Sequence, residues 1–264
     1  MKRIVLLTVL LTSIGLSACQ KNEKTIVVGA TPSPHAVILE SKEVKNYIAS
    51  KGYNLKVNVY QDYITPNKAL DDEGLDANYF QHIPYLNEEV DNKGYKISAA
   101  CEVHNEPLNL YSISKVDSFK KKIYIVNDAS NVERAFRLLK ANNIIDSYDV
   151  TSFDAQHPSY TSSIGATIEC IDPPLLHKKV EEGFLAVIPG NYALTAWDAS
   201  LASSYKLFGE ASDVAYPNII ACRTVDLNSE KINVLVEALA QEAVKSFIEH
   251  TFGPTVNYCF NDLR

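Results

Sequence analysis

Residues 75–86, Leu-Asp-Ala-Asn-Tyr-Phe-Gln-His-Ile-Pro-Tyr-Leu, gather ring and amide side chains around one proline. Aromatic rings beside carboxamides suit a small ligand that is partly apolar and partly polar. The alternative is a capped turn whose rings pack under the following helix, because loop cores use the same residue types. Since the run lacks β-branched alternation, we predict a loop that opens a helix at Pro84.

A second candidate for ligand chemistry is the cation Arg134. Ser130 and Glu133 have the spacing of a capping box, so we place Arg134 in the first turn of a helix. There the guanidinium and the free N–H groups of the helix terminus could share one carboxylate. The alternative is a surface arginine that pairs with Glu133 or Asp128.

Motifs of known catalytic and metal sites are missing from the sequence. It has no Gly-x-Ser-x-Gly elbow, no glycine-rich phosphate loop and no His-Glu-x-x-His. The six histidines are scattered, and without a short-range ligand pair we favour loop or surface histidines over a metal site. The formal net charge of −7 argues against nucleic acid as a partner. We therefore expect a binding protein that is not an enzyme and uses no cofactor.

The elements that must position these residues follow from the apolar pattern. Thr65 before Pro66 predicts an N-cap and a helix over 66–72, and a long apolar stripe predicts one helix over 229–250. Residues 189–191 are predicted to be a loop. Alternating strands and helices favour an α/β protein whose parallel strands end in ligand-facing loops. The predicted strands cover residues 25–29, 55–59, 96–98, 109–112, 122–126 and 185–188.

The N-terminus has the features of a secretory signal. A basic start, Met-Lys-Arg, precedes an almost wholly apolar run over residues 4–16, which is too short to span a membrane. Small residues before Cys19 resemble the bacterial lipobox, in which the thiol receives a lipid. An ordinary signal with an incidental cysteine is the alternative. We predict a signal peptide over 1–18, a lipid anchor at Cys19 and a tether over 19–24.

The other four cysteines are widely spaced and lack a Cys-x-x-Cys pair, so zinc and thioredoxin signatures are excluded. An exported protein permits disulfides, with three possible connectivities, but does not require them. We treat these cysteines as buried small apolar residues. They are Cys101, Cys170, Cys222 and Cys259.

Residues 61–70 and 76–86 closely resemble two motifs of the NlpA/MetQ family of methionine-binding lipoproteins. Further motifs match in the same order over nearly all of the mature chain. These further matches are Gly29 to Pro32, Pro34 to Ala36, Glu106-Pro107, Asn127-Asp128, Ser130-Asn131, Arg134, Gly190 to Ala193 and Asn218 to Ile220.

The resemblance implies a type II periplasmic-binding-protein fold, in which two α/β lobes joined by crossover strands hold a ligand in the cleft between them. With crossovers near Leu110 and Asn218, lobe 1 covers residues 25–111 and 214–264, and lobe 2 covers 112–213. The implied function is a lipid-anchored receptor on the extracytoplasmic face of the cell membrane. It would deliver methionine or a related amino acid to the permease and ATPase of an ABC importer. The alternative is a surface lipoprotein that retains the scaffold but serves adhesion or binds a non-methionine ligand.

An amino acid needs a cation for its carboxylate, acceptors for its ammonium and a pocket for its side chain. Aromatic rings can select a thioether by about 0.3–1.5 kcal/mol per contact, although the same rings suit leucine or phenylalanine. Glu106 is the candidate counter-charge for the ammonium, and turn formation is the alternative role of the asparagines. The candidate ligand-binding residues are Tyr63, Phe80, His82, Tyr85, Glu106, Arg134, Asn191 and Asn218.

One position departs from the family pattern. Pro189 stands where family members usually have an asparagine that helps to fix the amino-acid backbone, and proline offers neither a side-chain amide nor a backbone N–H. Asn191 is the candidate substitute. The aromatic part of the pocket is thus retained, whereas the polar part that would identify the ligand is altered.

Overall fold

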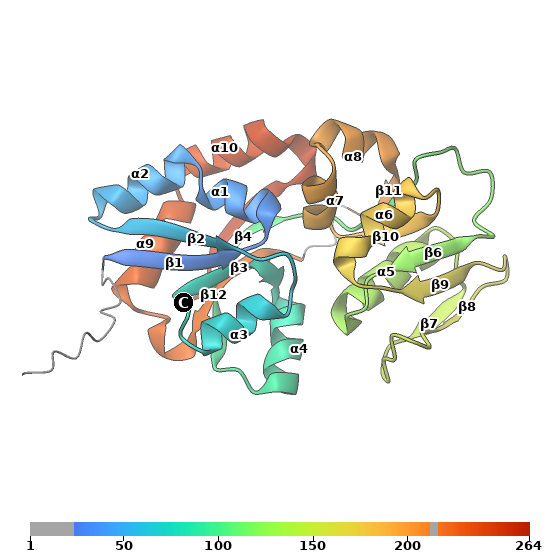
Figure 1. Cartoon of the computed structure of the whole chain (residues 1–264), viewed down its shortest axis with the longest axis horizontal. Coiled ribbons are helices and arrows are strands. Elements are labelled where there is room, and N and C mark those ends of the chain that lie inside the picture. The colour runs from blue at the N-terminus through green and yellow to red at the C-terminus, as the bar shows by residue number, and fades with distance from the viewer. Residues whose placement is uncertain (1–23, 212–215) are drawn as a thin grey trace, which may run out of the picture.

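The computed structural model describes residues 24–211 and 216–264. The predicted signal peptide over 1–18, the predicted anchor Cys19 and nearly all of the predicted tether lie outside the described residues. Within the two described ranges, no helix is both long enough and apolar enough to cross a membrane. These ranges form two α/β lobes that lie end to end along the long axis (Figure 1).

The first lobe is built on a mixed sheet with the strand order β13-β4-β12-β3-β1-β2. Strand β1 pairs in parallel with β2 and β3, whereas β12 runs antiparallel to β3 and β4. The strands are Thr25–Ala30 (β1), Asn54–Val59 (β2), Ala77–His82 (β3), Ile97–Asn105 (β4), Asn218–Arg223 (β12) and Asn257–Asp262 (β13).

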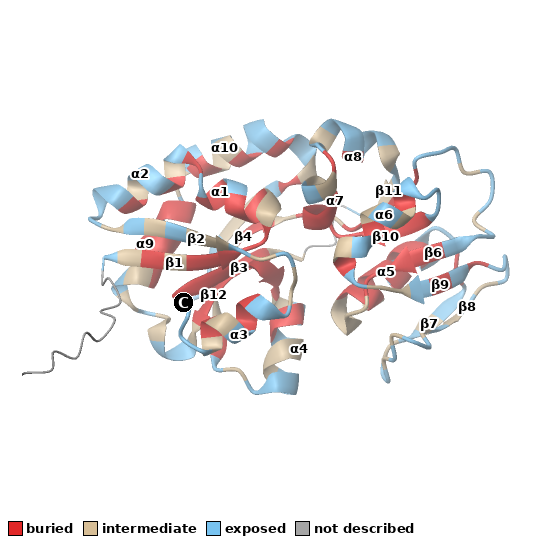
Figure 2. Ribbon diagram, viewed as in Figure 1, coloured by how far each residue is buried: buried red, intermediate tan, exposed pale blue. Residues whose placement is uncertain are grey.

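Helices cover both faces of this sheet. Helices α1, α2, α9 and α10 pack on one face, around a core cluster that includes Val28 and Leu235, and α3 and α4 pack on the other with Leu70 and Leu86. Figure 2 shows burial concentrated in the sheet and in the helix sides turned toward it. The helices are Val37–Leu39 (α1), Lys42–Ser50 (α2), Thr65–Asp71 (α3), Ile83–Lys93 (α4), Glu230–Leu239 (α9) and Glu242–Phe252 (α10), with the short turns Pro32–Ala36 (η1), Thr224–Asp226 (η3) and Gly253–Thr255 (η4).

The second lobe has a sheet with the strand order β11-β5-β10-β6-β9 and a small hairpin of β7 and β8. The chain passes between the two sheets twice, from β4 to β5 and from β11 to β12. The strands are Asn109–Tyr111 (β5), Lys122–Ile125 (β6), Ser147–Asp149 (β7), Ser159–Thr161 (β8), Thr167–Cys170 (β9), Leu185–Ile188 (β10) and Lys206–Gly209 (β11). The helices are Ala129–Ala141 (α5), Leu176–Glu181 (α6), Gly190–Ala196 (α7) and Ala199–Tyr205 (α8), with the turn Pro173–Leu175 (η2).

The segment predicted as a loop over 75–86 contains strand β3, so this prediction was wrong. All six residues of β3 are buried, between β1 and β12. A strand buried on both faces shows no alternation of polar and apolar residues. Its polar side chains are satisfied because the amides of Asn67, Asn78 and Gln81 donate hydrogen bonds to one another. Helix α4 does open beside Pro84, as predicted.

Two further local predictions were wrong. The stripe over 229–250 belongs to two helices, α9 and α10, with a break at Ala240 and Gln241. Both helices pack on the same core cluster, so the apolar pattern gives no sign of the break.

Thr65 is the first residue of α3 rather than its N-cap, because the Asp62 carboxylate accepts the Thr65 N–H at 2.7 Å. Cys101, Cys170, Cys222 and Cys259 are free thiols. Cys101 and Cys222 are buried, as expected, whereas Cys170 and Cys259 are partly exposed, contrary to the expectation.

Helix α5 begins with a different cap from the predicted one. Asp128, not Ser130, is the N-cap residue, and its carboxylate accepts the Asn131 N–H at 2.9 Å. Glu133 instead forms an ion pair with an arginine one turn later. Because the helix begins at residue 129, Arg134 lies in the second turn, beyond the free N–H groups of the terminus, contrary to prediction.

Replacing Asp128 by alanine is expected to lower the free energy of unfolding by about 0.5–2 kcal/mol, because the start of α5 loses its hydrogen-bond acceptor. Urea unfolding followed by circular dichroism measures the difference. Ser130→Ala is the matched control and should have a smaller effect, since the Ser130 hydroxyl donates to the Asp128 carboxylate and is not the cap of α5. A larger loss for Ser130→Ala would contradict this cap.

Candidate functional site

A small cavity lies between the two lobes. Its walls come from β3, α4, β12 and the loop before α3 on one side, and from α5 and the start of α7 on the other. The lining residues are Tyr63, Phe80, Gln81, His82, Tyr85, Glu106, Asn131, Arg134, Pro189, Gly190, Asn191 and Asn218.

The eight candidate residues of the sequence analysis all line this cavity, and their role in binding stays a prediction. Sequence reasoning did not assign Gln81, Asn131 and Gly190 to the site, although Gln81 lies within 75–86. The signal for Asn131 was its spacing of three residues from Arg134, which puts both side chains on one face of a helix.

One wall of the cavity is aromatic. The ring centroid of Tyr63 lies 5.8 Å from those of Phe80 and Tyr85, a separation typical of favourable ring pairs. The Tyr85 hydroxyl donates to the Tyr63 carbonyl at 3.2 Å, and the Tyr63 hydroxyl donates to Asn191 Oδ1 at 2.6 Å. Burial raises the pKa of both phenols, so this wall is uncharged at neutral pH.

His82 links the aromatic wall to the second lobe. Its Nδ1 accepts the Tyr85 N–H at 3.2 Å and so caps α4. Because Nδ1 is an acceptor, the ring proton is assigned to Nε2, which donates to Asn131 Oδ1 at 3.1 Å. Burial, together with the nearby Arg134 charge, lowers the pKa of His82 to about 3. His82 is therefore a neutral donor that orients the Asn131 amide.

The Arg134 guanidinium is paired with a residue that sequence reasoning did not name. Its Nε donates to Glu210 Oε1 at 2.9 Å, and its Nη2 donates to Glu210 Oε2 at 2.6 Å. Nη1 donates to Asn131 Oδ1 at 3.1 Å, and the Tyr216 ring lies 4.2 Å from the guanidinium carbon. Arg134 is only 4% exposed, so the alternative interpretation of a surface arginine was wrong.

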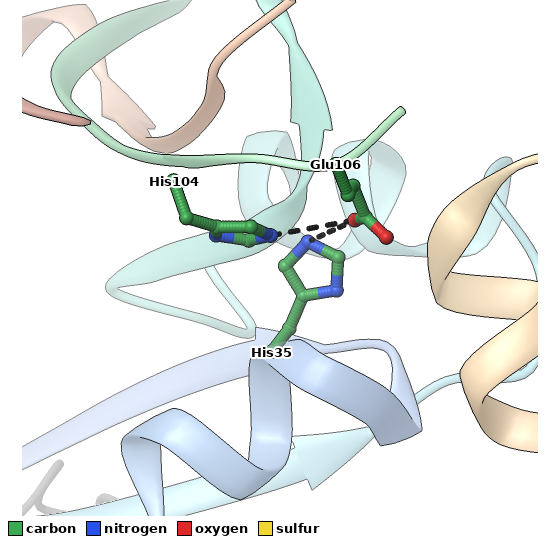
Figure 3. Close-up of side chains that lie close together, drawn as sticks. All are labelled: His35, His104 and Glu106. Atoms are coloured by element: carbon green, nitrogen blue, oxygen red, sulfur yellow. Dashed lines mark hydrogen bonds and ion pairs between the residues drawn. The ribbon is translucent and has the colours of Figure 1, made fainter. Parts of the chain in front are cut away.

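Glu106 follows β4 and lies beside two imidazoles (Figure 3). Its Oε1 lies 3.4 Å from His104 Nε2 and 3.6 Å from His35 Nε2. These three residues could each offer one atom to a metal ion. All four ring nitrogens already lie within hydrogen-bond distance of protein oxygens, however. We therefore interpret the cluster as a hydrogen-bond network of the protein itself.

Other side chains also form hydrogen bonds with the two imidazoles. His35 Nδ1 bonds Thr31 Oγ1 at 2.7 Å and its Nε2 bonds Asn218 Oδ1 at 2.9 Å, while His104 Nδ1 bonds the Tyr79 hydroxyl. Burial lowers the pKa of His35 to about 4 and that of His104 to about 3, so both rings are neutral. The prediction of loop or surface histidines was wrong here, because these partners come from distant segments that spacing does not reveal.

One oxygen of the Glu106 carboxylate has no hydrogen-bond partner in the described part of the chain and lies at the wall of the cavity. Its Oε2 is buried without a hydrogen-bond partner among the described residues, and it lies against Gly190, where an added Cβ would come within 2.5 Å of it. Burial raises the pKa of Glu106 to about 7, although the charge of Arg134 opposes this shift. A buried carboxylate oxygen of this kind is suited to accept a hydrogen bond from a ligand cation.

The segment predicted as a loop over 189–191 is instead the start of α7. Pro189 is the N-cap residue, and the helix begins at Gly190. A helix can begin directly after proline, because the missing N–H is not needed there. Asn191 therefore reaches the cavity from the first turn of α7, at the place where the sequence analysis sought a substitute for the missing asparagine.

Comparison with known proteins agrees with the resemblance seen in the motifs. A family profile described as NlpA lipoprotein matches residues 26–258. The methionine-binding lipoprotein MetQ of Bacillus subtilis (strain 168) is 35% identical to this chain, covering 97% of it and 98% of its own length.

Solved structures give the same result. A nutrient binding protein from Burkholderia cenocepacia bound to methionine is 30% identical, with a TM-score of 0.79 over 89% of this chain and 100% of its own. An ABC transporter periplasmic substrate-binding protein from Coxiella burnetii is 29% identical, with a TM-score of 0.79 over 89% and 100%. The predicted fold class is confirmed, and these relatives are described as binding proteins rather than enzymes, as expected.

Gly190→Ala is expected to lower the free energy of unfolding by about 1–3 kcal/mol, because the new methyl group would overlap the Glu106 side chain. Urea unfolding measures this loss. In a Glu106→Gly background the same substitution should have a smaller effect, and an equal effect would contradict the steric explanation. Gly94→Ala is a useful comparison for backbone strain without steric overlap. The φ of Gly94 is +73°, and no atom lies within 4 Å of a Cβ added there.

Proposed function

The chain belongs to the NlpA lipoprotein family, and we therefore propose that it is the substrate-binding lipoprotein of an ABC importer. Its ligand is methionine or a related amino acid, held in the cavity between the lobes. Cys19 carries the lipid that keeps the protein on the extracytoplasmic face of the cell membrane, and a separate permease with its ATPase receives the ligand. Relatives described as a methionine-binding lipoprotein and an ABC transporter substrate-binding protein support this proposal.

The observation that carries the proposal is a pair of unlike charged groups on one small cavity. Arg134 offers a cation, and Glu106 offers a carboxylate oxygen without a partner among the described residues. A free α-amino acid has a carboxylate and an ammonium on one carbon, so a single ligand satisfies both groups. We assign the ligand carboxylate to Arg134 and the ammonium to Glu106, with Asn191 and Asn218 as further polar contacts.

The aromatic wall takes the ligand side chain. A thioether gains about 0.3–1.5 kcal/mol from each well-placed ring, so several rings favour methionine over a branched aliphatic side chain. The residues assigned to this role are Tyr63, Phe80, His82 and Tyr85, all on the first lobe.

Binding groups on both lobes also fit a role in uptake. We propose lobe boundaries near 25–111 and 214–264 for lobe 1 and near 112–213 for lobe 2, although β5 (Asn109–Tyr111) already pairs in the sheet of the second lobe. Closing lobe 2 would bring Arg134 and Asn191 onto a ligand held by lobe 1, and such hinge closure is a common response to small ligands. A permease can then distinguish the loaded form by its shape.

A second candidate function is favoured by Pro189. The missing asparagine removes one polar contact that relatives use, so the scaffold could serve another ligand or adhesion. Mass spectrometry of the purified protein after denaturation separates these candidates. Released methionine supports uptake of methionine. A different small molecule, or none, supports the second candidate, and a calorimetric screen of L- and D-amino acids then identifies any ligand.

Arg134→Ala is expected to weaken methionine binding by about 2–5 kcal/mol, because the ligand carboxylate loses its buried cation. Isothermal titration calorimetry measures the change. Arg137→Ala, one turn later on α5 and exposed in its ion pair with Glu133, is the matched control and should bind normally.

Arg134→Ala also leaves Glu210 unpaired, so its folding must be checked by its melting temperature, and Arg134→Lys serves as a variant that keeps the positive charge. A folded Arg134→Ala protein with unchanged affinity would rule out the proposed carboxylate site.

Affinity for methionine is expected to rise with pH up to about 7 and then level off. Burial raises the pKa of Glu106 in the free protein, and a bound ammonium lowers it again by favouring the carboxylate. Binding below pH 7 therefore releases a proton, and this linkage ends once Glu106 is already ionised in the free protein. Calorimetry in two buffers with different ionisation enthalpies measures the proton. Glu106→Gln should abolish the release, and wild-type binding without it would contradict the assignment.

A further inference from the structure

We infer that Glu210 is a specificity-determining residue, which makes the cavity select amino acids with a free ammonium group over analogues that carry only a carboxylate. Such monoanions include N-acylated amino acids and 2-hydroxy acids. The inference rests on the proposed function, because it takes Arg134 to bind the ligand carboxylate.

Glu210 occupies one edge of the guanidinium and leaves another available. Its two oxygens accept from Nε and Nη2 of Arg134 at 2.9 and 2.6 Å. On the outer edge, Nη1 donates to Asn131 Oδ1 at 3.1 Å, and Nη2 makes a long contact of 3.4 Å to the Glu106 carbonyl. A guanidinium has five N–H donors, and these four contacts leave one donor of Nη1 without an acceptor and one donor of Nη2 in a long contact only. A ligand carboxylate at the outer edge would bind these two donors. Arg134 would then be shared by two carboxylates.

Glu210 is held firmly in this position. Its Oε2 accepts the Leu108 N–H at 2.7 Å, and its own N–H donates to the Leu108 carbonyl at 2.9 Å. Leu108 lies on the β4–β5 connection and Glu210 directly follows β11, so both connections between the sheets fix this carboxylate. Its side chain is only 5% exposed. A carboxylate held in this way stays on the guanidinium when a ligand arrives.

The charges around the cavity then favour a zwitterion. Among the described lining residues Arg134 is the one permanent cation, and Glu210 already balances it. The imidazoles are neutral because burial lowers their pKa values. An amino acid completes an alternating series of charges: the Glu210 carboxylate, Arg134, the ligand carboxylate, the ligand ammonium and the Glu106 carboxylate. Every neighbouring pair of charges in this series is of opposite sign, so each contact is attractive.

A monoanion leaves the series incomplete. Its carboxylate would share Arg134 with Glu210 as a like charge, and no ammonium would offset that repulsion. A second, wider pocket shares Tyr63 and Tyr85 with the cavity, and its charge adds to the effect. Besides tyrosine, its ionisable lining side chains are the carboxylates of Asp62, Glu88, Glu89, Asp128 and Asp172 and the single amine of Lys93.

Glu210→Gln tests the inference on the full-length chain. Calorimetry at neutral pH compares three ligands: methionine, N-acetylmethionine and the 2-hydroxy analogue of methionine. The wild type should prefer methionine, and this preference should fall by roughly tenfold or more in Glu210→Gln, as expected for removing one like charge at short range. Glu210→Asp keeps the charge and should retain the preference, even if all affinities fall. Glu133→Gln removes an exposed carboxylate that pairs with Arg137 and is the matched control.

The ratio of affinities separates specificity from a structural role. If Glu210 only supports the fold, Glu210→Gln weakens the binding of all three ligands by the same factor. The unchanged ratio of affinities then overturns this inference but not the proposed function. If Glu210→Gln does not fold, the wild type still decides, because equal wild-type affinities for methionine and its two analogues overturn the inference. If the wild type binds none of the three ligands, the proposed function fails as well.

Discussion

The buried carboxylate of Glu106 is the constraint on which the rest of the site depends. A carboxylate removed from water must be hydrogen-bonded, paired with a cation or protonated. Two neutral imidazoles lie beside one of its oxygens, and Gly190 has no side chain where the other oxygen lies. The elements that bear these residues, η1, β4 and α7, therefore have to meet at this point. Their meeting leaves the second oxygen of Glu106 without a hydrogen-bond partner among the described residues, at the wall of the cavity.

The sequence predicted which residues meet in the cavity better than it predicted their local structure. Rings and amides at the right spacings, together with ordered motifs, identified eight residues that line one cavity. Strand β3 was missed because its polar residues looked unsuited to burial. The amide partner Asn67 lies on a different element, so the hydrogen bonds that make burial possible exist only in the folded chain. Glu210 was missed for the same reason, since it lies 76 residues after Arg134.

The ion pair of Arg134 and Glu210 contacts both connections between the lobes. Glu210 lies on one connection and accepts a hydrogen bond from Leu108 on the other, and the ring of Tyr216 packs against the guanidinium. The group assigned to the ligand carboxylate is therefore attached to the same segments about which the lobes would turn. On the proposed function, charge recognition and lobe orientation would depend on one set of contacts, and we expect changes in either to affect the other.

Direct hydrogen bonds between the lobes have a consequence for signalling. Tyr63 donates to Asn191, His82 donates to Asn131, and the Tyr192 hydroxyl donates to the Gln61 carbonyl at 3.3 Å. Each such bond stabilises closure by about 0.5–1.5 kcal/mol without any contribution from cargo. On the proposed function, they raise apparent affinity by enlarging the closed population, but they also raise the fraction of empty receptors that a permease would mistake for loaded ones. On that function, the strength of these hydrogen bonds would set a compromise between sensitive capture and ATP hydrolysed without transport.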